Sequence, residues 1–275
     1  MAAEGWRVVT QRDRERLRST FDQAAELYDR ARPRYPTGLF DDLAELAGIG
    51  PGSSVLEIGP GTGQATVALA ERGCRVVAVE LGADLAAVAR RNLARFPAVE
   101  VVTAPFEDWP LPEEPFDLVL GATAFHWIDP EVRVVKAADA LRPGGMLATV
   151  TTHHVAGGDD SFFAQAQACY GRWDPETPPG GVPLRPATDI PSSSEELDRS
   201  HRFGPATFRR YEWEQAYTTA GYVEVLLTYS GHRALDPAAQ SGLLDCIAHL
   251  IDAGYGGRVV KRYLTELRVA STIGP

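Results

Sequence analysis

The sequence is poor in lysine and cysteine and has no long apolar run. Its 275 residues include two lysines, Lys136 and Lys261, so nearly all of its positive charge comes from arginine. Few lysines beside many alanines and prolines indicate a GC-rich bacterial genome. The cysteines Cys74, Cys169 and Cys246 have no metal-ligand or redox-motif spacing, and this odd, scattered set fits a reducing cytoplasm.

Several classes of protein are disfavoured by what is missing. No segment approaches the ~18 apolar residues of a membrane span, and residues 1–20 are too charged to resemble a signal peptide. A formal net charge of −10 argues against nucleic acid or an anionic membrane as partner, because both need a basic surface. A length of 275 residues is enough for one large α/β domain with insertions, or one domain with a small cap, and the apolar share of 44% supports a real core. We expect a cytoplasmic protein, monomeric or homodimeric.

Short apolar strands alternate with helical stretches through the first half of the chain. Strands apolar on both faces, with helices between them, are typical of a parallel sheet covered on both sides. Strands are predicted at 54–58, 75–80, 99–103, 116–121 and 146–152, with helices at 63–72, 83–95 and 130–141. Further strands are predicted at 206–212 and 259–270, and further helices at 214–228 and 236–253.

The flanking segments differ from this alternation. Helical spacing at 10–30 and 37–48 precedes it, and prolines at 33 and 36 end the first of these stretches. Residues 155–205 are rich in Gly, Pro, Ser and Asp, with a helical patch at 161–172, and are read as an insertion that shapes a pocket. The expected division is a helical lid at 1–50, a core at 51–154, the insertion at 155–205, and strands and helices at 206–275 that complete the sheet.

The most informative segment is residues 55–66, which read Val-Leu-Glu-Ile-Gly-Pro-Gly-Thr-Gly-Gln-Ala-Thr. A turn with glycine at 59, 61 and 63 lets a ligand approach the backbone closely. A helix that begins there offers unpaired N–H groups to a polar or anionic group. The site should therefore hold part of a nucleotide-like molecule.

Two nucleotide ligands compete for this turn. A dinucleotide fingerprint has the order G-x-G-x-x-G, whereas here the third glycine comes one residue early. Glu57, just before the turn, would repel a pyrophosphate but could pair with an ammonium group. Glu80 ends the second strand, where a carboxylate can take both hydroxyls of a ribose. A nicotinamide dehydrogenase on a similar sheet stays an alternative, as does a protein that binds such a ligand without catalysing a reaction.

At this point the chain resembles the class I S-adenosylmethionine-dependent methyltransferases, and is similar to a bacterial small-molecule subgroup near the methyltransferase type 11 and trans-aconitate-type enzymes. The matching motifs lie in the family's order and spacing between about 50 and 152: Glu57-Ile58-Gly59-Pro60-Gly61-Thr62-Gly63, Val79-Glu80, Phe116-Asp117-Leu118-Val119 and Leu141-Arg142-Pro143-Gly144-Gly145. The resemblance implies a Rossmann-like, doubly wound, mostly parallel seven-stranded sheet. It also implies an N-terminal helical lid and an insertion after the fifth strand.

The resemblance implies S-adenosyl-L-methionine as methyl donor and S-adenosyl-L-homocysteine as product. Glu57 and the glycine turn would hold the methionine part and Glu80 the ribose. Many members have an Asp where this chain has Ala104 and Pro105, so adenine is expected on backbone groups and on Phe106, unless Phe106 is a plain core residue. The implied donor contacts are Tyr28, Arg32, Glu57, Gly59, Pro60, Gly61, Thr62, Gly63, Glu80, Leu81, Pro105, Phe106, Glu107, Ala122 and Phe125.

The acceptor contacts are expected after the fourth and fifth strands and in the lid. His126 could act as a general base, and Trp127 could donate its indole N–H to an acceptor carboxylate. Alternatively, both rings pack under the following helix. Tyr35, His153 and Tyr229 complete the expected acceptor contacts; Tyr35 shares the lid with Tyr28 and Arg32, unless that helix simply docks on the core.

A metal site is not expected. His153, His154, Asp159 and Asp160 make one conceivable, but adjacent strand residues point to opposite faces. The expected reaction is transfer of a methyl group to a small-molecule acceptor. Oxygen is the favoured acceptor atom, including that of a carboxylate, and nitrogen and carbon stay open.

Overall fold

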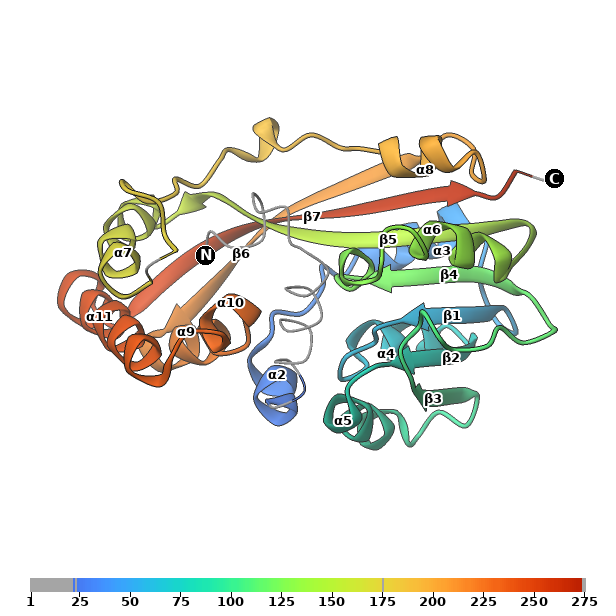
Figure 1. Cartoon of the computed structure of the whole chain (residues 1–275), viewed down its shortest axis with the longest axis horizontal. Helices are drawn as coiled ribbons and strands as arrows, with labels where there is room; N and C mark the ends of the chain where they lie inside the picture. Colours follow the sequence, from blue (N-terminus) through green and yellow to red (C-terminus); the bar gives the residue numbers. More distant parts are fainter. Residues whose placement is uncertain (1–21, 23, 175, 274–275) are drawn as a thin grey trace. The chain divides into compact units, whose positions relative to one another are not determined.

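The computed structural model describes residues 22, 24–174 and 176–273. Most of the predicted helix at 10–30 lies outside these residues, and its described end is α2. The described elements are α2 (Ala25–Ala31), α3 (Leu39–Ala47), β1 (Ser54–Ile58), α4 (Gln64–Glu71), β2 (Arg75–Glu80), α5 (Ala83–Leu93), β3 (Val99–Thr103), β4 (Phe116–Ala122), η1 (Phe125–Trp127), α6 (Arg133–Asp139), β5 (Leu141–Gly158), α7 (Asp160–Trp173), η2 (Ala187–Asp189), α8 (Glu195–Ser200), β6 (Thr207–Thr218), α9 (Thr219–Leu226), α10 (Ser230–Arg233), α11 (Pro237–Tyr255) and β7 (Arg258–Ser271) (Figure 1).

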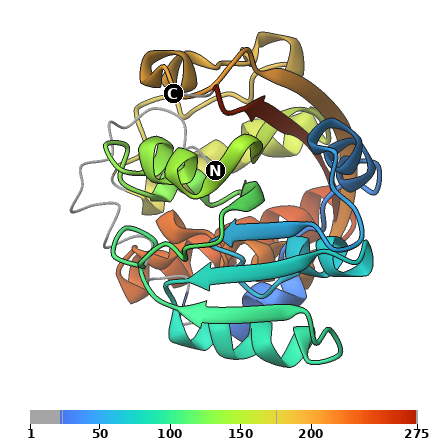
Figure 2. The ribbon, with the colours of Figure 1, turned by 90° about the vertical axis from the view of Figure 1, so that its right-hand side faces the viewer.

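The strands form one seven-stranded sheet in the order β3-β2-β1-β4-β5-β7-β6. β1 pairs in parallel with β2 and β4, β2 with β3, and β4 with β5. Figure 2 shows β1, β2 and β3 running in the same direction, and in Figure 1 the arrow of β7 runs opposite to that of β5. The predicted α/β class and mostly parallel seven-stranded sheet are confirmed, and β7 runs antiparallel to its neighbour β5.

The chain forms two compact units. Unit 1 comprises the described residues of Met1–Pro33, His153–Pro191 and Glu212–Leu264; unit 2 comprises those of Arg34–Thr152, Ser192–Tyr211 and Thr265–Pro275. The boundaries fall inside β5, β6 and β7, so each of these strands contributes to both units. The units do not follow the predicted division into 1–50, 51–154, 155–205 and 206–275. The functions expected of the lid at 1–50 and of the insertion at 155–205 therefore stay predictions.

Helices cover both faces of the sheet in unit 2. On one face, α3 and α4 bury Leu43 and Leu69 against Val55 and other strand residues. On the other face, α6 and α8 pack with the phenylalanines that follow β3 and β4. Because helices pack on both faces of the sheet, β1 and β4 are mainly apolar on both faces.

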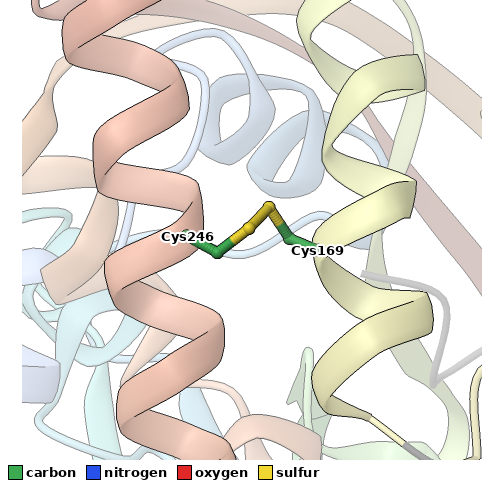
Figure 3. Close-up of a disulfide and its surroundings, with 2 residues drawn as sticks. All are labelled: Cys169 and Cys246. Carbon is green, nitrogen blue, oxygen red and sulfur yellow. A yellow bond between two sulfur atoms is a disulfide. The ribbon is translucent and has the colours of Figure 1, made fainter.

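Unit 1 has its own core, in which α7, α9 and α11 pack together. A disulfide between Cys169 on α7 and Cys246 on α11 joins two of these helices (Figure 3). Nothing in the sequence spacing indicated this pair, and the scattered cysteines therefore no longer support the expectation of a reducing compartment. Cys74, in unit 2, is a buried free thiol.

Two predicted boundaries were wrong. β5 is longer than predicted, so His153 and His154 lie within the strand instead of following it. Residues 214–218 belong to β6 and not to a helix. There, the aromatic residues at 211, 213 and 217 all stand at odd-numbered positions, and this period of two places them on one face of a strand. Within the described residues, no helix is both long and apolar enough to cross a membrane.

Candidate functional site

The turn after β1 requires glycine at three positions. Gly59, Gly61 and Gly63 have φ values of 64°, 60° and 90°, a region that side chains with a Cβ rarely adopt. A Cβ on Gly59 would lie 2.6 Å from the Cβ of Ala124, in the loop after β4. The backbone N–H of Gly59 donates to the carbonyl of Val79 at 2.9 Å. The carboxyl ends of β1, β2 and β4 therefore meet at this turn.

Glu80, the last residue of β2, is held by backbone donors on two sides. Its Oε2 accepts a hydrogen bond from the N–H of Gly61 at 2.9 Å, and its Oε1 accepts one from the N–H of Gly82 at 2.9 Å. Each carboxylate oxygen has a second lone pair. The protein thus fixes the orientation of the Glu80 carboxylate beside the glycine turn.

Buried polar atoms without a partner gather beside the same turn. Glu57 is 1% exposed, and its Oε2 has no hydrogen-bond partner among the described residues. The same holds for side-chain polar atoms of Thr62, Gln64 and Thr66. Burial raises the pKa of the Glu57 carboxyl to about 7. An isolated buried carboxylate is costly, so this arrangement complements a ligand cation.

The helix after the turn adds backbone donors. α4 begins after Gly63, which has no side chain to cap the first N–H groups of the helix. The N-terminus of α4 therefore faces the turn with its backbone donors available. Asn92 of α5 fixes the turn from another side, because its amide donates to the carbonyl of Thr62 at 3.0 Å.

The expected donor contacts after β2 and β3 differ in how exposed they are to solvent. Phe106 is buried in the core of unit 2, with the Lys136 ammonium 5.3 Å from its ring centre. The Glu107 carbonyl accepts from Lys136 Nζ at 2.8 Å. Leu81, in contrast, is 39% exposed. Phe106 occupies a core position, and donor contacts by Leu81, Pro105, Phe106 and Glu107 stay predictions.

The loop after β4 is held in an unusual conformation. Thr123 has a φ of 58°, which is unfavourable for a β-branched residue. The Tyr35 hydroxyl lies 2.8 Å from Thr123 Oγ1 and donates to the carbonyl of Ala122 at 3.2 Å. Tyr35, Ala122 and the loop residues are thereby brought together in unit 2.

His126 and Trp127 follow in the short helix η1. The His126 side chain is exposed and Trp127 is half-buried, with the ring centres 5.0 Å apart. Arg133 of α6 donates to the carbonyl of His126 at 3.4 Å and also contacts those of Phe125 and Ile128. The exposed His126 ring differs from the alternative in which both rings pack under the helix.

The other predicted residues lie in unit 1. The Arg32 guanidinium lies 5.0 Å from the ring centre of Tyr28 and 4.5 Å from that of Tyr229, and it donates to the carbonyl of Thr228 at 2.9 Å. Two predicted residues, Tyr28 and Tyr229, therefore contact the guanidinium of a third, Arg32. The fourth predicted residue of unit 1, His153, lies inside β5.

A polar cluster inside unit 1 was not predicted from the sequence. Lys261 is fully buried, and two buried hydrogen-bonded pairs lie in the same unit, Tyr170 with His232 and Tyr217 with Tyr263. The available signal was the rarity of lysine, since Lys261 is one of only two lysines in the sequence. Among the described residues, no group of three or more His, Cys, Asp or Glu side chains is placed to hold a metal ion.

The part of the chain that contains the glycine turn is similar to known methyltransferases. Residues 56–149 match the family profile described as "Methyltransferase domain". An uncharacterised methyltransferase of Mycobacterium tuberculosis (strain H37Rv) is 38% identical over 131 residues, which are 48% of this chain and 51% of that protein. The chain thus spans about half the length of the first curated relatives that it matches.

Two further similarities extend over most of the chain. A malonyl-[acyl-carrier protein] O-methyltransferase of Geobacter sulfurreducens is 28% identical over 271 residues, or 95% of this chain and 89% of that protein. A solved structure from Anaeromyxobacter dehalogenans, provisionally named a type II methyltransferase, has a TM-score of 0.61 and 25% identity, and the match covers 89% of this chain and 99% of that one.

Proposed function

We propose that this protein, which belongs to the class I S-adenosylmethionine-dependent methyltransferases and carries their methyltransferase domain at residues 56–149, transfers a methyl group to a small-molecule acceptor. The observation that carries the proposal is the glycine turn between two buried carboxylates, Glu57 before it and Glu80 across from it. Each carboxylate complements one part of S-adenosyl-L-methionine.

The residues present fit that donor. Glu57 would bind the ammonium of the methionine part, because its buried carboxylate otherwise has an oxygen with no partner among the described residues. Glu80 would accept from the ribose hydroxyls, because its carboxylate is oriented at the turn by the backbone N–H groups of Gly61 and Gly82. When bound, the donor supplies a sulfonium methyl group for in-line transfer. The protein's contribution is alignment, which can be worth roughly 7–11 kcal/mol.

A nicotinamide dehydrogenase is the second candidate on a sheet of this kind. Its pyrophosphate would sit at the start of α4, next to Glu57. A buried carboxylate there repels an anion, and the third glycine stands one residue too early for the dinucleotide fingerprint. Both features favour the methyl donor.

The favoured acceptor atom is oxygen, including that of a carboxylate. The similarity over 95% of the chain to a protein named an O-methyltransferase supports oxygen. A carboxylate acceptor needs no general base, whereas a phenol, amine or carbon acid needs one, and the exposed His126 is the candidate base. Trp127 would anchor an acceptor carboxylate through its indole N–H.

The test is methyl transfer from S-adenosyl-L-methionine to a panel of small carboxylic acids, phenols and amines, read as a mass increase of about 14 Da. The panel is run on the wild type, His126→Ala, Trp127→Ala and the control His249→Ala, which removes an exposed histidine of α11. Methyl esters formed by the wild type and His126→Ala, with a raised acceptor KM in Trp127→Ala, support the proposal.

Two results would contradict it. If S-adenosyl-L-homocysteine binds but no acceptor gains mass, the protein is a cofactor-binding protein without transfer. If NAD stabilises the protein against heat and S-adenosyl-L-homocysteine does not, the dehydrogenase alternative holds.

A further inference from the structure

Thr123, the residue after β4, has a backbone conformation that its side chain disfavours. Its φ is 58°, in the left-handed region where a β-branched residue is rarely found. Among the described residues, the other non-glycine residue with a positive φ is His201, which directly follows the last turn of α8, a common place for this conformation. Thr123 ends no helix. A conformation of this kind persists only where surrounding contacts impose it.

Thr123 is held through both its backbone and its side chain. Its backbone N–H donates to the carbonyl of Val150 on β5 at 2.8 Å, which continues the pairing of β4 with β5. Its Oγ1 lies 2.8 Å from the hydroxyl of Tyr35, and that hydroxyl donates to the carbonyl of Ala122 at 3.2 Å. With its proton given to Ala122, the Tyr35 oxygen can accept from the Thr123 hydroxyl, so the two bonds are compatible. Tyr35 therefore holds the residue from outside the sheet.

Tyr35 is itself fixed, in the segment that precedes α3. Its ring meets that of Phe40 edge-on, with 5.7 Å between the ring centres, and it packs against the core that α3 helps to form. Pro36 follows it, and a residue before proline favours an extended backbone. A ring with little freedom thus presents its hydroxyl to Thr123, and both residues belong to unit 2.

The loop that starts at Thr123 lies directly against the glycine turn. Ala124 approaches Gly59 so closely that a Cβ added to the glycine would lie 2.6 Å from the Ala124 Cβ. The N–H of Trp127 donates to the carbonyl of Ala124 at 2.9 Å, so η1 is tied to the same point. A change in the φ of Thr123 would therefore move Ala124 relative to Gly59, and η1 with it.

We propose that Tyr35 is a positioning residue of the methyl-donor site, whose hydroxyl holds Thr123 in the left-handed conformation that sets Ala124 against Gly59. The inference rests on the proposed function, and it gives Tyr35 a role through the loop instead of the acceptor contact predicted from the sequence. Loss of an acceptor contact would raise the acceptor KM and leave the affinity for S-adenosyl-L-homocysteine unchanged. Loss of a contact that positions the loop weakens that affinity.

The first measurement concerns the loop itself and needs no ligand. Tyr35→Phe removes the hydroxyl and keeps the ring. In this variant the Thr123 amide should exchange its hydrogen at least fivefold faster than in the wild type, measured by NMR on the full chain, because its bond to Val150 opens more often. Tyr211→Phe is the matched control, since it removes another half-buried hydroxyl of unit 2, one that donates to Asp42. It should leave the exchange of the Thr123 amide unchanged.

A double-mutant cycle then links the loop to the ligand. By calorimetry, Tyr35→Phe should bind S-adenosyl-L-homocysteine at least fivefold more weakly than the wild type, and Tyr211→Phe equally well. Glycine adopts a φ near 58° without strain, so in the Thr123→Gly background Tyr35→Phe should change the affinity less than twofold.

Three results would overturn the proposal: unchanged exchange of the Thr123 amide in folded Tyr35→Phe, unchanged affinity in that variant, or an equal loss of affinity in the Thr123→Gly background. Failure of the proposed function would look different, because the wild type itself would then not bind S-adenosyl-L-homocysteine, whatever the exchange rate of the Thr123 amide.

Discussion

The carboxylate of Glu80, at the end of β2, accepts a hydrogen bond of 2.9 Å from the backbone N–H of Gly61, in the turn after β1. One side chain thus ties together the two strand ends at which the methyl donor is expected to bind. Glu80→Gln should reduce affinity for S-adenosyl-L-homocysteine at least tenfold, because an amide has one acceptor oxygen where the carboxylate has two.

Calorimetric titration of Glu80→Gln measures this loss. Glu100→Gln, at an exposed position on β3, is the matched control and should bind as the wild type does. Unchanged affinity in Glu80→Gln would mean that the carboxylate serves only the turn.

Glu57 should make the ligand-free protein less stable as pH rises. Its pKa is about 7 in the folded state, whereas the ordinary value for a glutamate is 4.5, so the folded state loses stability between pH 4.5 and 7. Glu57→Gln removes this penalty, and should raise the free energy of unfolding above pH 7 by up to about 3 kcal/mol. The two proteins should be nearly equal in stability at pH 4.5. Urea unfolding at several pH values tests this, and a gain independent of pH would contradict it.

Lys261 should have the opposite pH dependence. Its pKa falls from 10.5 to about 7 on folding, so burial of the ammonium penalises the folded state at pH 7 and below. The penalty disappears as pH rises from 7 to 10.5. Lys261→Met should therefore be more stable than the wild type at pH 6, by at most about 5 kcal/mol. A Tm difference that fails to shrink toward pH 10 would show that the lysine is not buried as a charge.

The disulfide between Cys169 and Cys246 should stabilise unit 1. It joins residues 77 positions apart. In the chain-entropy account, closing a loop of that length lowers the entropy of the unfolded chain and so raises the free energy of unfolding by about 4 kcal/mol. Dithiothreitol should lower the Tm of the wild type. It should leave the Tm of the double variant Cys169→Ala, Cys246→Ala unchanged, and an equal shift in both proteins would indicate another cause.

Local patterns explain what could be predicted from the sequence. β1 to β4 are short, mainly apolar segments bounded by turns, so their positions follow from neighbouring residues. Glu57 and Glu80 were found for the same reason, because each stands within a few residues of a strand end. The extent of β5 and β6 was missed because Pro143, Gly144 and polar residues along β6 obscure the strand pattern.

Long-range contacts explain what could not be predicted. Cys169 and Cys246 meet only because α7 and α11 pack side by side. The burial of Lys261 depends on Phe163, which lies almost a hundred residues earlier on α7. No spacing rule links such positions, and their chemistry becomes visible only when the core of unit 1 is assembled.

The most direct test of the donor site is calorimetric titration of the full chain with S-adenosyl-L-homocysteine and, separately, with NAD, at pH 6 and pH 8. If Glu57 binds the ligand ammonium, S-adenosyl-L-homocysteine should bind more tightly at pH 8, where the carboxyl is ionised, and NAD should not bind. Glu57→Gln should bind S-adenosyl-L-homocysteine weakly at both pH values. Tight binding of NAD, or equal affinity for S-adenosyl-L-homocysteine in the wild type and Glu57→Gln, would contradict the assignment of this turn to the methyl donor.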